Sequence, residues 1–306
     1  AVGCTHLSFG SECGDIETLQ TLAREILDPD TQCEITALLQ RSPELSYAMA
    51  RERVLTEKLG ECGSFLSQPN NILAVEYLKA IYKNAYPITP ITVKRIGSGH
   101  DKAGEQGPKS ASELRGLMET GADISAHIPE TALSVYRRER ATGRGRDKAV
   151  LETALLSRLR MLDRNVYESL PDGGDGAGAR LWKAVREEST LEDIAQAART
   201  KRYPLARMRR MLLCAALGVS AEYTKTLPPY ARVLAADSAG CAYLREIDGK
   251  SAVPVLTKPA AVRRLDGGAA KVFALGASAH DVYTLQNVTN SDKKCGQDWR
   301  NGPVIV

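Results

Sequence analysis

Apolar positions recur every three or four residues over residues 72–81. This spacing predicts a helix with one buried face. Asn70 and Asn71 stand at its start, where polar side chains commonly satisfy free backbone N–H groups. We expect the buried face to consist of Ile72, Val75, Leu78, Ala80 and Ile81.

Two segments with the pattern of strands lie near this helix in the sequence. Two prolines within residues 86–90 end the helix, and residues 91–96 then form a short predicted strand that finishes in Lys94 and Arg95. An earlier strand is predicted over residues 5–9, before a polar loop that begins at Gly10 and leads into a helix. From the residues alone this loop is more often a plain βα turn than a site of close approach to a nucleotide. Ligands of α/β sheets bind at such edges, where free backbone N–H groups and a helix dipole favour anions.

A second predicted helix start lies at residues 110–115, after a loop rich in Gly, Lys and Asp over residues 97–109. Ser110 and Glu113 have the spacing of a capping box, which is a structural role. The alternative is a phosphate-binding helix start in which Ser110, Ser112 and Arg115 face the ligand, and both roles can hold together. The composition of the preceding loop predicts a mobile segment that could close over a bound ligand.

Residues 29–66 are helical by pattern and show no candidate chemistry, so we interpret Arg51 and Arg53 as a solvated helix face. Residues 126–130 are predicted to form the hinge into a second, helical region. There, residues 130–140 have an amphipathic pattern with Leu133 and Val135 on the buried side. Residues 171–178, PDGGDGAG, predict a flexible surface loop.

The densest basic segment covers residues 200–211, which hold five Lys or Arg residues and no acid. Pro204 predicts the first turn of a helix. Arg207 and Arg210 then share a face with Tyr203, and guanidinium planes and an aromatic ring suit phosphates and unstacked bases. A solvated helix face is the plain alternative. The candidate RNA contacts are Lys201, Arg202, Arg207 and Arg210.

The pattern changes again after residue 227, where a strand over residues 230–236, a helix over 238–247, an extended piece at 254–256 and a helix over 269–285 predict a small α/β region. Trp299 is interpreted as a packing anchor. The sequence therefore predicts an α/β fold with three parts. These are residues 1–125, an α/β part; residues 126–226, a helical part; and residues 227–306.

Composition adds few constraints. Of the 306 residues, 43% are hydrophobic and 25% charged, as in ordinary globular proteins, and the net charge of +4 permits a polyanionic partner without requiring one. Seven cysteines without a CxxC pair argue against a disulfide framework and a zinc site, so no metal ligands are assigned. The longest apolar run, residues 211–219, is too short to cross a bilayer. We therefore expect a cytoplasmic protein without a membrane partner.

Four phrases occur in a characteristic order: LSFGSECGDIETL, NNILAVEYLKAI with a later KRIG, SASELR, and TKRYPLARMRRM. Together they resemble the bacterial tRNA(Met) cytidine acetate ligases, members of the nucleotidyltransferase superfamily with a His-x-Gly-His signature. The resemblance covers nearly the whole chain. It implies a partial Rossmann-like nucleotidyltransferase domain, then a mainly α-helical, tRNA-binding domain, then the small α/β appendage.

The resemblance also implies a reaction. Acetate attacks the α-phosphate of ATP, with Mg²⁺ present, and the wobble cytidine of elongator tRNA(Met) then accepts the acetyl group. Gly10 matches a glycine of the family's ATP pocket, and Gly10, Asn70 or Asn71, and Arg95 are the predicted ATP-binding residues. The resemblance strengthens the phosphate role of Ser110, Ser112 and Arg115. No catalytic residue is assigned.

One departure from the family pattern concerns the signature itself. The four histidines, His6, His100, His127 and His280, include no His-x-Gly-His, and the chain opens at Ala1 on a strand-like phrase. We expect a fragment of a longer enzyme or the loss of the first strands. The alternatives are a non-catalytic RNA-binding protein and a nucleotidyltransferase acting on a small molecule, the latter disfavoured by the long basic helical region.

Overall fold

The structure is a computed structural model that describes residues 2–42, 44–96, 109–144, 147–224 and 226–306. Its contacts form two compact units, one of Cys4–Glu130 and one of Thr131–Val306 together with Ala1–Gly3. The division at residue 226 predicted from the sequence stays a prediction. The loop over residues 97–108, predicted to close over a ligand, lies outside the described residues.

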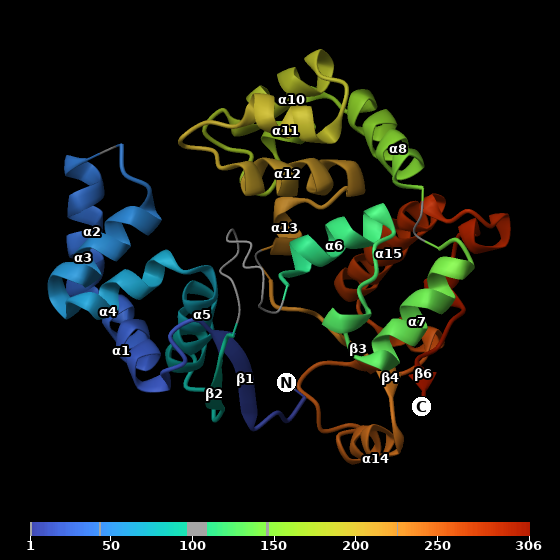
Figure 1. The fold of residues 1–306 in the computed structure, drawn as a ribbon, viewed down its shortest axis with the longest axis horizontal. Helices are drawn as coiled ribbons and strands as arrows, with labels where there is room; N and C mark the ends of the chain where they lie inside the picture. Colours follow the sequence, from blue (N-terminus) through green and yellow to red (C-terminus); the bar gives the residue numbers. More distant parts are fainter. Residues whose placement is uncertain (1, 43, 97–108, 145–146, 225) are drawn as a thin grey trace. The chain divides into compact units, whose positions relative to one another are not determined.

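The first unit is built on two strands, β1 (His6–Ser11) and β2 (Thr89–Lys94), which the sequence pattern predicts and which the structure pairs in parallel. Helices α1 (Ile16–Leu27) and α5 (Pro69–Lys83) pack beside them (Figure 1). Phe9 and the apolar faces of both helices form the core there, whereas Ile91 and Val93 are exposed on β2. The helices therefore cover one side of the strand pair.

Helix α5 confirms the predicted helix, but its buried face differs from the prediction. Val75, Leu78 and Ile81 are buried as expected, whereas Ala80 is exposed and Ile72 only partly buried. The residue before Pro69 is the N-cap, and Asn71 lies inside the helix with a fully buried side chain. The buried face therefore includes Asn71, whose side-chain amide is hydrogen-bonded within the protein.

Further helices complete this unit. They are α2 (Pro29–Arg41), α3 (Tyr47–Leu59), α4 (Glu61–Ser64), η1 (Phe65–Ser67), α6 (Ala111–Thr120) and η2 (Ser125–His127). The interpretation of Arg51 as solvated is wrong, because its side chain is 6% exposed and its Nη1 lies 3.0 Å from Glu76 Oε1. Arg53 is exposed as expected. Glu76 lies on α5, so the sequence pattern of α3, which contains Arg51, gives no sign of this ion pair.

The second unit has a helical core. Its helices are α7 (Glu130–Ala141), α8 (Lys148–Met161), α9 (Arg164–Glu168), α10 (Ala177–Glu187), α11 (Leu191–Ala198), α12 (Leu205–Leu217) and α13 (Ala221–Thr224). Tyr167 is buried in the centre, where its hydroxyl donates to the Leu159 carbonyl at 2.6 Å and burial raises its pKa to about 12. In α7, Leu133 is buried as predicted, but Val135 is 46% exposed, which contradicts its predicted burial. Helix α7 buries a narrower stripe than its sequence pattern indicates.

The C-terminal region is a small α/β structure. It contains β3 (Ala231–Arg232), β4 (Ala235–Ala236), α14 (Ser238–Glu246), β5 (Val255–Leu256), η3 (Pro259–Arg264), α15 (Gly267–Tyr283), η4 (Thr284–Gln286), η5 (Asn290–Lys293), η6 (Gln297–Trp299) and β6 (Val304–Ile305). The single strand predicted over residues 230–236 is in fact two strands, because β3 pairs with β5 and β4 pairs with β6. Trp299 packs against Phe273 with ring centroids 4.8 Å apart.

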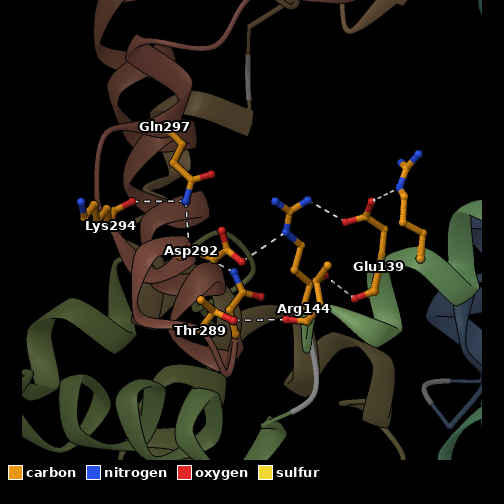
Figure 2. Close-up of polar contacts among 9 residues, drawn as sticks. Glu139, Arg144, Thr289, Asp292, Lys294 and Gln297 are labelled. Carbon is orange, nitrogen blue, oxygen red and sulfur yellow. Dashed lines mark hydrogen bonds and ion pairs between the residues drawn. The ribbon is translucent and has the colours of Figure 1, made fainter.

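The end of α7 is held to the C-terminal segment by a polar network around Arg144 (Figure 2). Arg144 Nη1 lies 2.6 Å from Glu139 Oε2, and its Nε lies 3.5 Å from Asp292 Oδ2. The Thr289 hydroxyl donates to the Thr142 carbonyl at 3.2 Å. These contacts join segments nearly 150 positions apart. Among the described residues, no helix combines the length and apolar character needed to cross a membrane.

Candidate functional site

Gly10 and Arg95 lie side by side at the carboxyl ends of β1 and β2. Gly10 pairs with Val93, and the Arg95 amide donates to the Ser11 carbonyl at 2.9 Å. A Cβ built on Gly10 would lie 3.4 Å from Arg95 Cγ, which is an ordinary contact. The structure therefore brings the two predicted residues together on an exposed sheet edge. Nothing in the protein itself requires glycine at position 10, because alanine would fit.

Gly14 and Lys94 form the other side of the same edge. Gly14 has φ of +69°, and a Cβ there would lie 2.5 Å from Lys94 Cβ. Glycine is therefore required at position 14 by both backbone conformation and space. The Lys94 stem crosses the loop before α1, so the two cations that end β2 lie on opposite sides of the strand pair.

The start of α5 is occupied by a carboxylate of this same chain. Glu12 Oε1 accepts from the Asn70 backbone N–H at 3.1 Å and from Asn70 Nδ2 at 2.6 Å. Glu12 Oε2 accepts from the Asn71 backbone N–H at 2.8 Å. The anion expected at this helix N-terminus is thus supplied by the loop that follows β1, and these donors are satisfied without a ligand.

Asn71 completes a reciprocal set of hydrogen bonds. Its Oδ1 accepts from the Glu12 N–H at 2.9 Å and from the Cys13 N–H at 3.1 Å. Its Nδ2 donates to the Phe65 carbonyl at 3.2 Å and to Gln68 Oε1 at 2.7 Å. Because both ends of this buried amide are paired within the protein, Asn71 holds the loop in place. Asn70 is half-exposed, and its Oδ1 keeps acceptor capacity.

The charge on Glu12 is stabilised by this arrangement. Burial raises the pKa of its carboxyl group, but the hydrogen bonds from Asn70 and Asn71 outweigh burial and leave the pKa below its usual value. Glu12 is therefore ionised at neutral pH. Sequence reasoning missed this residue, and the available signal was an acid in a loop directly after a strand.

The predicted helix start at Ser110 is confirmed as a capping box. Ser110 Oγ accepts from the Glu113 N–H at 3.2 Å, and Glu113 Oε2 accepts from the Ser110 N–H at 2.7 Å. Arg115 Nη2 donates to Ser112 Oγ at 3.0 Å. Part of the segment between β2 and α6 lies outside the described residues. The Ser110 cap is therefore described by itself, apart from Gly10.

The described residues offer no ready-made metal cage. Within them, no group of three or more His, Cys, Asp or Glu side chains lies together in a way that could hold a metal ion. Mg²⁺ usually keeps several waters and binds through substrate phosphates with few protein carboxylates. The edge at Gly10 and Arg95 is compatible with a metal that arrives on a nucleotide.

The basic residues of α12 and its approach are paired with acids from other elements. Arg202 Nη2 lies 2.8 Å from Asp175 Oδ2, and Arg210 forms an ion pair with Asp172. Arg207 Nη2 donates to the Asp172 carbonyl. Of the four predicted RNA contacts, only Lys201 is exposed without a partner among the described residues. The fold brings Asp172 and Asp175 to a basic segment, residues 200–211, whose own sequence contains no acid.

Tyr203 lies in the interior rather than on the surface. It is 8% exposed, its hydroxyl donates to the Asp175 carbonyl, and the Arg207 guanidinium lies 5.0 Å from its ring centroid. The expectation that this ring is displayed to bases is therefore wrong. Asp172 and Asp175 adopt positive φ of 64° and 58°. The loop predicted to be flexible is bonded to the arginines at both aspartates.

The chain is similar to known proteins in both sequence and fold. The family model described as HIGH Nucleotidyl Transferase matches residues 1–298. A tRNA(Met) cytidine acetate ligase of Syntrophomonas wolfei is 30% identical over 98% of this chain and 76% of its own length. A crystal structure of Thermotoga maritima TmcAL in its apo form matches with a TM-score of 0.89 at 24% identity, covering 99% of this chain and 77% of that one.

A second Thermotoga maritima TmcAL structure, bound with alpha-thio ATP, matches with a TM-score of 0.87 at 23% identity over 99% of this chain and 76% of that one. At these identities the two structures establish the fold. They confirm the predicted class, a nucleotidyltransferase-like α/β arrangement with a large helical part.

Proposed function

This chain belongs to the tRNA(Met) cytidine acetate ligase family of HIGH nucleotidyltransferases, and from that premise we propose that it acetylates the wobble cytidine of elongator tRNA(Met) with ATP and acetate. It is a ligase by family, and the ATP analogue bound by the Thermotoga maritima structure supports ATP as its nucleotide. The observation that carries the assignment is the family match across nearly the whole chain. A tRNA substrate also makes the cytoplasm the proposed compartment.

The proposed chemistry has two steps. An oxygen of acetate bonds to the α-phosphorus of ATP, the bond to the β-phosphate oxygen breaks, and pyrophosphate leaves. The exocyclic amine of cytidine then attacks the acetyl carbonyl, loses a proton and releases AMP. Both steps need charge spread over phosphate oxygens, which cations and backbone N–H groups provide. Mg²⁺ is proposed to enter with ATP and neutralise phosphate charge.

We assign the ATP contacts to the edge formed by β1 and β2. Gly10 lets the nucleotide approach the backbone closely, and the exposed guanidinium of Arg95 pairs with phosphate. Asn70 is favoured over Asn71 for contact with ribose or phosphate, because the Asn71 amide has all its hydrogen bonds inside the protein. Ser110, Ser112 and Arg115 remain the proposed second phosphate contact.

The proposed tRNA contacts on the helical part are Lys201, Arg202, Arg207 and Arg210. A guanidinium has five N–H donors, so an arginine that is paired with one carboxylate still has donors for phosphate. The partner acids Asp172 and Asp175 lower the net charge of this surface. We therefore propose that this surface positions the tRNA. It contributes less to the electrostatic attraction between protein and tRNA than the number of its arginines indicates.

A rival function has one observation in its favour. The 306 residues contain no His-x-Gly-His, so a protein that binds RNA without catalysis is the alternative. Pyrophosphate release separates the two. The ligase releases pyrophosphate only when ATP and acetate are both present, and transfers labelled acetate to tRNA(Met). Binding of tRNA without pyrophosphate release would favour the rival.

Gly10→Ala tests the proposed ATP edge without disturbing the fold. The new methyl group contacts Arg95 at an ordinary distance, so the melting temperature should stay near that of the parent. The KM for ATP should rise on the order of tenfold, equivalent to about 1.4 kcal/mol of binding. Gly276→Ala is the matched control, because its Cβ would meet nothing within 4 Å. An unchanged KM in Gly10→Ala would remove ATP from this edge.

A further inference from the structure

Five of the seven acids in residues 227–306 take part in local contacts. Asp237 caps α14 and Asp266 caps α15 through hydrogen bonds from backbone N–H groups. Asp281 accepts from the Gly296 N–H at 2.7 Å. Asp292 and Asp298 pair with arginines, Arg144 at 3.5 Å and Arg232 at 3.0 Å. These contacts hold five carboxylates at fixed positions within the fold, and two of the five already have arginine partners.

Three cations on the β5–η3 segment keep their charge exposed. Lys258, Arg263 and Arg264 are all exposed, and within the part of the chain that the structure describes, none has an acidic partner. This differs from the basic segment at residues 201–210, where Arg202 and Arg210 pair with aspartate carboxylates and Arg207 donates to the Asp172 carbonyl. We name Lys258, Arg263 and Arg264 the η3 cluster.

Two hollows that share Leu256 and Thr257 in their linings border the η3 cluster. The smaller, of about 40 Å³, is lined by Lys258, by Asn301 and by the ion pair between Arg232 and Asp298. The larger, of about 540 Å³, is lined by Arg264 and Arg245, with Asp248 as its acidic member and mostly apolar side chains otherwise. A volume of this size can admit a nucleotide-sized group. The larger hollow therefore combines two cations and one acid with room for a ligand.

An exposed aromatic ring lies beside the same segment. Trp299 on η6 is 46% exposed, and η6 packs against η3. Its ring is held by the edge-on contact with Phe273, over which the Arg232 guanidinium lies at 5.2 Å. Arg300 follows directly and donates to the Cys295 carbonyl. A partly exposed indole that is held by a ring contact is suited to stacking on an unpaired base.

From these observations we propose that the η3 cluster and Trp299 form an RNA-binding surface that contacts unpaired nucleotides of the tRNA, a proposal that rests on the proposed function for its partner. The cluster neutralises phosphates, and Trp299 stacks on a base. Exposed cations release counterions from RNA on binding, whereas arginines already paired with aspartate release fewer. This surface therefore supplies more of the salt-dependent attraction than the arginines of α12.

The test compares two triple variants with equal loss of charge. One is K258Q/R263Q/R264Q. The matched control is R53Q/R164Q/K183Q, which removes three exposed cations that pair with acids four residues on. Affinity for tRNA(Met) transcript is measured by fluorescence anisotropy from 50 to 300 mM KCl. We expect the η3 variant to lose at least about tenfold in affinity and to show a salt slope lower by roughly two, with little change in the control.

Trp299 is tested separately from charge. Trp299→Ala should weaken tRNA binding several-fold with an unchanged salt slope, and Trp299→Phe, which retains an aromatic ring against Phe273, should recover most of the affinity. Equal affinity and slope in the η3 variant and the control would overturn the proposal, as would absence of tRNA binding by the parent protein. Acetate-dependent pyrophosphate release by the parent, measured alongside, reports on the proposed function independently.

Discussion

At the scale of single residues, Glu12 and Asn71 exchange hydrogen bonds that fix the candidate nucleotide edge. The Glu12 carboxylate receives the first N–H groups of α5, and the Asn71 amide receives N–H groups of the loop that carries Glu12. Glu12 thus satisfies backbone N–H groups of the helix that contains Asn71, and Asn71 satisfies those of the loop that contains Glu12. The loop after β1 is thereby tied to α5 beside Gly10, which gives Glu12 a positioning role toward the proposed ATP contacts.

Glu12→Gln should weaken this connection. The amide retains one acceptor oxygen, but its NH₂ group would face a backbone N–H, so at least one hydrogen bond to the helix start is lost along with the charge. We expect the free energy of unfolding to fall by about 1 kcal/mol in urea denaturation, together with a higher KM for ATP. Glu57→Gln, an exposed residue paired with Arg53, serves as the control and should change stability by less than about 0.5 kcal/mol. Equal stabilities for the two variants would contradict the capping role.

At the scale of elements, connections between distant segments set the charge and rigidity of the surface. The loop at residues 171–176 meets α12 and the segment before it, where Asp172 pairs with Arg210 and Asp175 pairs with Arg202. Helix α7 ends against the segment at residues 287–294, where the Val288 amide donates to the Gly143 carbonyl at 3.0 Å. The loop at residues 171–176 looks free by composition, yet it is bonded to the basic segment, and residues 287–294 are likewise bonded to the chain just after α7.

Arg144→Ala should loosen the junction shown in Figure 2 without unfolding the protein. Arg144 is about half exposed, so its two ion pairs contribute at most about 1 kcal/mol to global stability. The expected result is faster amide hydrogen exchange in residues 139–144 and 287–294. Arg138→Ala removes a neighbouring partner of the same Glu139 and is the control. Exchange rates that change equally in both variants would show that Arg144 has no special bridging role.

At the scale of the whole molecule, stabilised carboxylates are present in both units. At Glu12 and Asp298, burial raises the pKa, but hydrogen bonds outweigh it and lower the pKa below its usual value. At Glu139 and Glu192, hydrogen bonds from arginine side chains lower the pKa. Because these groups hold their charge more strongly when folded, the folded state binds fewer protons than the unfolded state in acid.

The sign of the pH dependence follows from these shifts. A carboxyl group whose pKa is depressed by folding contributes its full stabilisation above its unfolded pKa and loses it as the pH falls through the folded value. The melting temperature measured by calorimetry should therefore be nearly flat from pH 7 to 5 and fall steadily below about pH 4.5, the ordinary value for Glu. A melting temperature that stayed constant down to pH 3 would show that these carboxylates are not preferentially ionised in the folded state.

The sequence by itself determined the features that depend on neighbouring residues. The helix that starts near Asn70 and Asn71, the capping box at Ser110 and the two strands that end near Gly10 and Arg95 follow from spacings of two to four residues, and the family resemblance follows from phrases of four to thirteen residues. Such signals are local because backbone hydrogen bonds and side-chain periodicity in helices and strands are local.

Only the tertiary structure decided which charges are paired and which side chains are buried. Glu12 meets Asn70 across 58 positions, and Arg210 meets Asp172 across 38. These contacts turned Asn71 inward, placed Tyr203 in the interior and neutralised much of the basic run, while the η3 cluster remained exposed. Pairing between charged groups depends on distance in space, and periodicity along the chain carries no information about which acid will fold against which arginine.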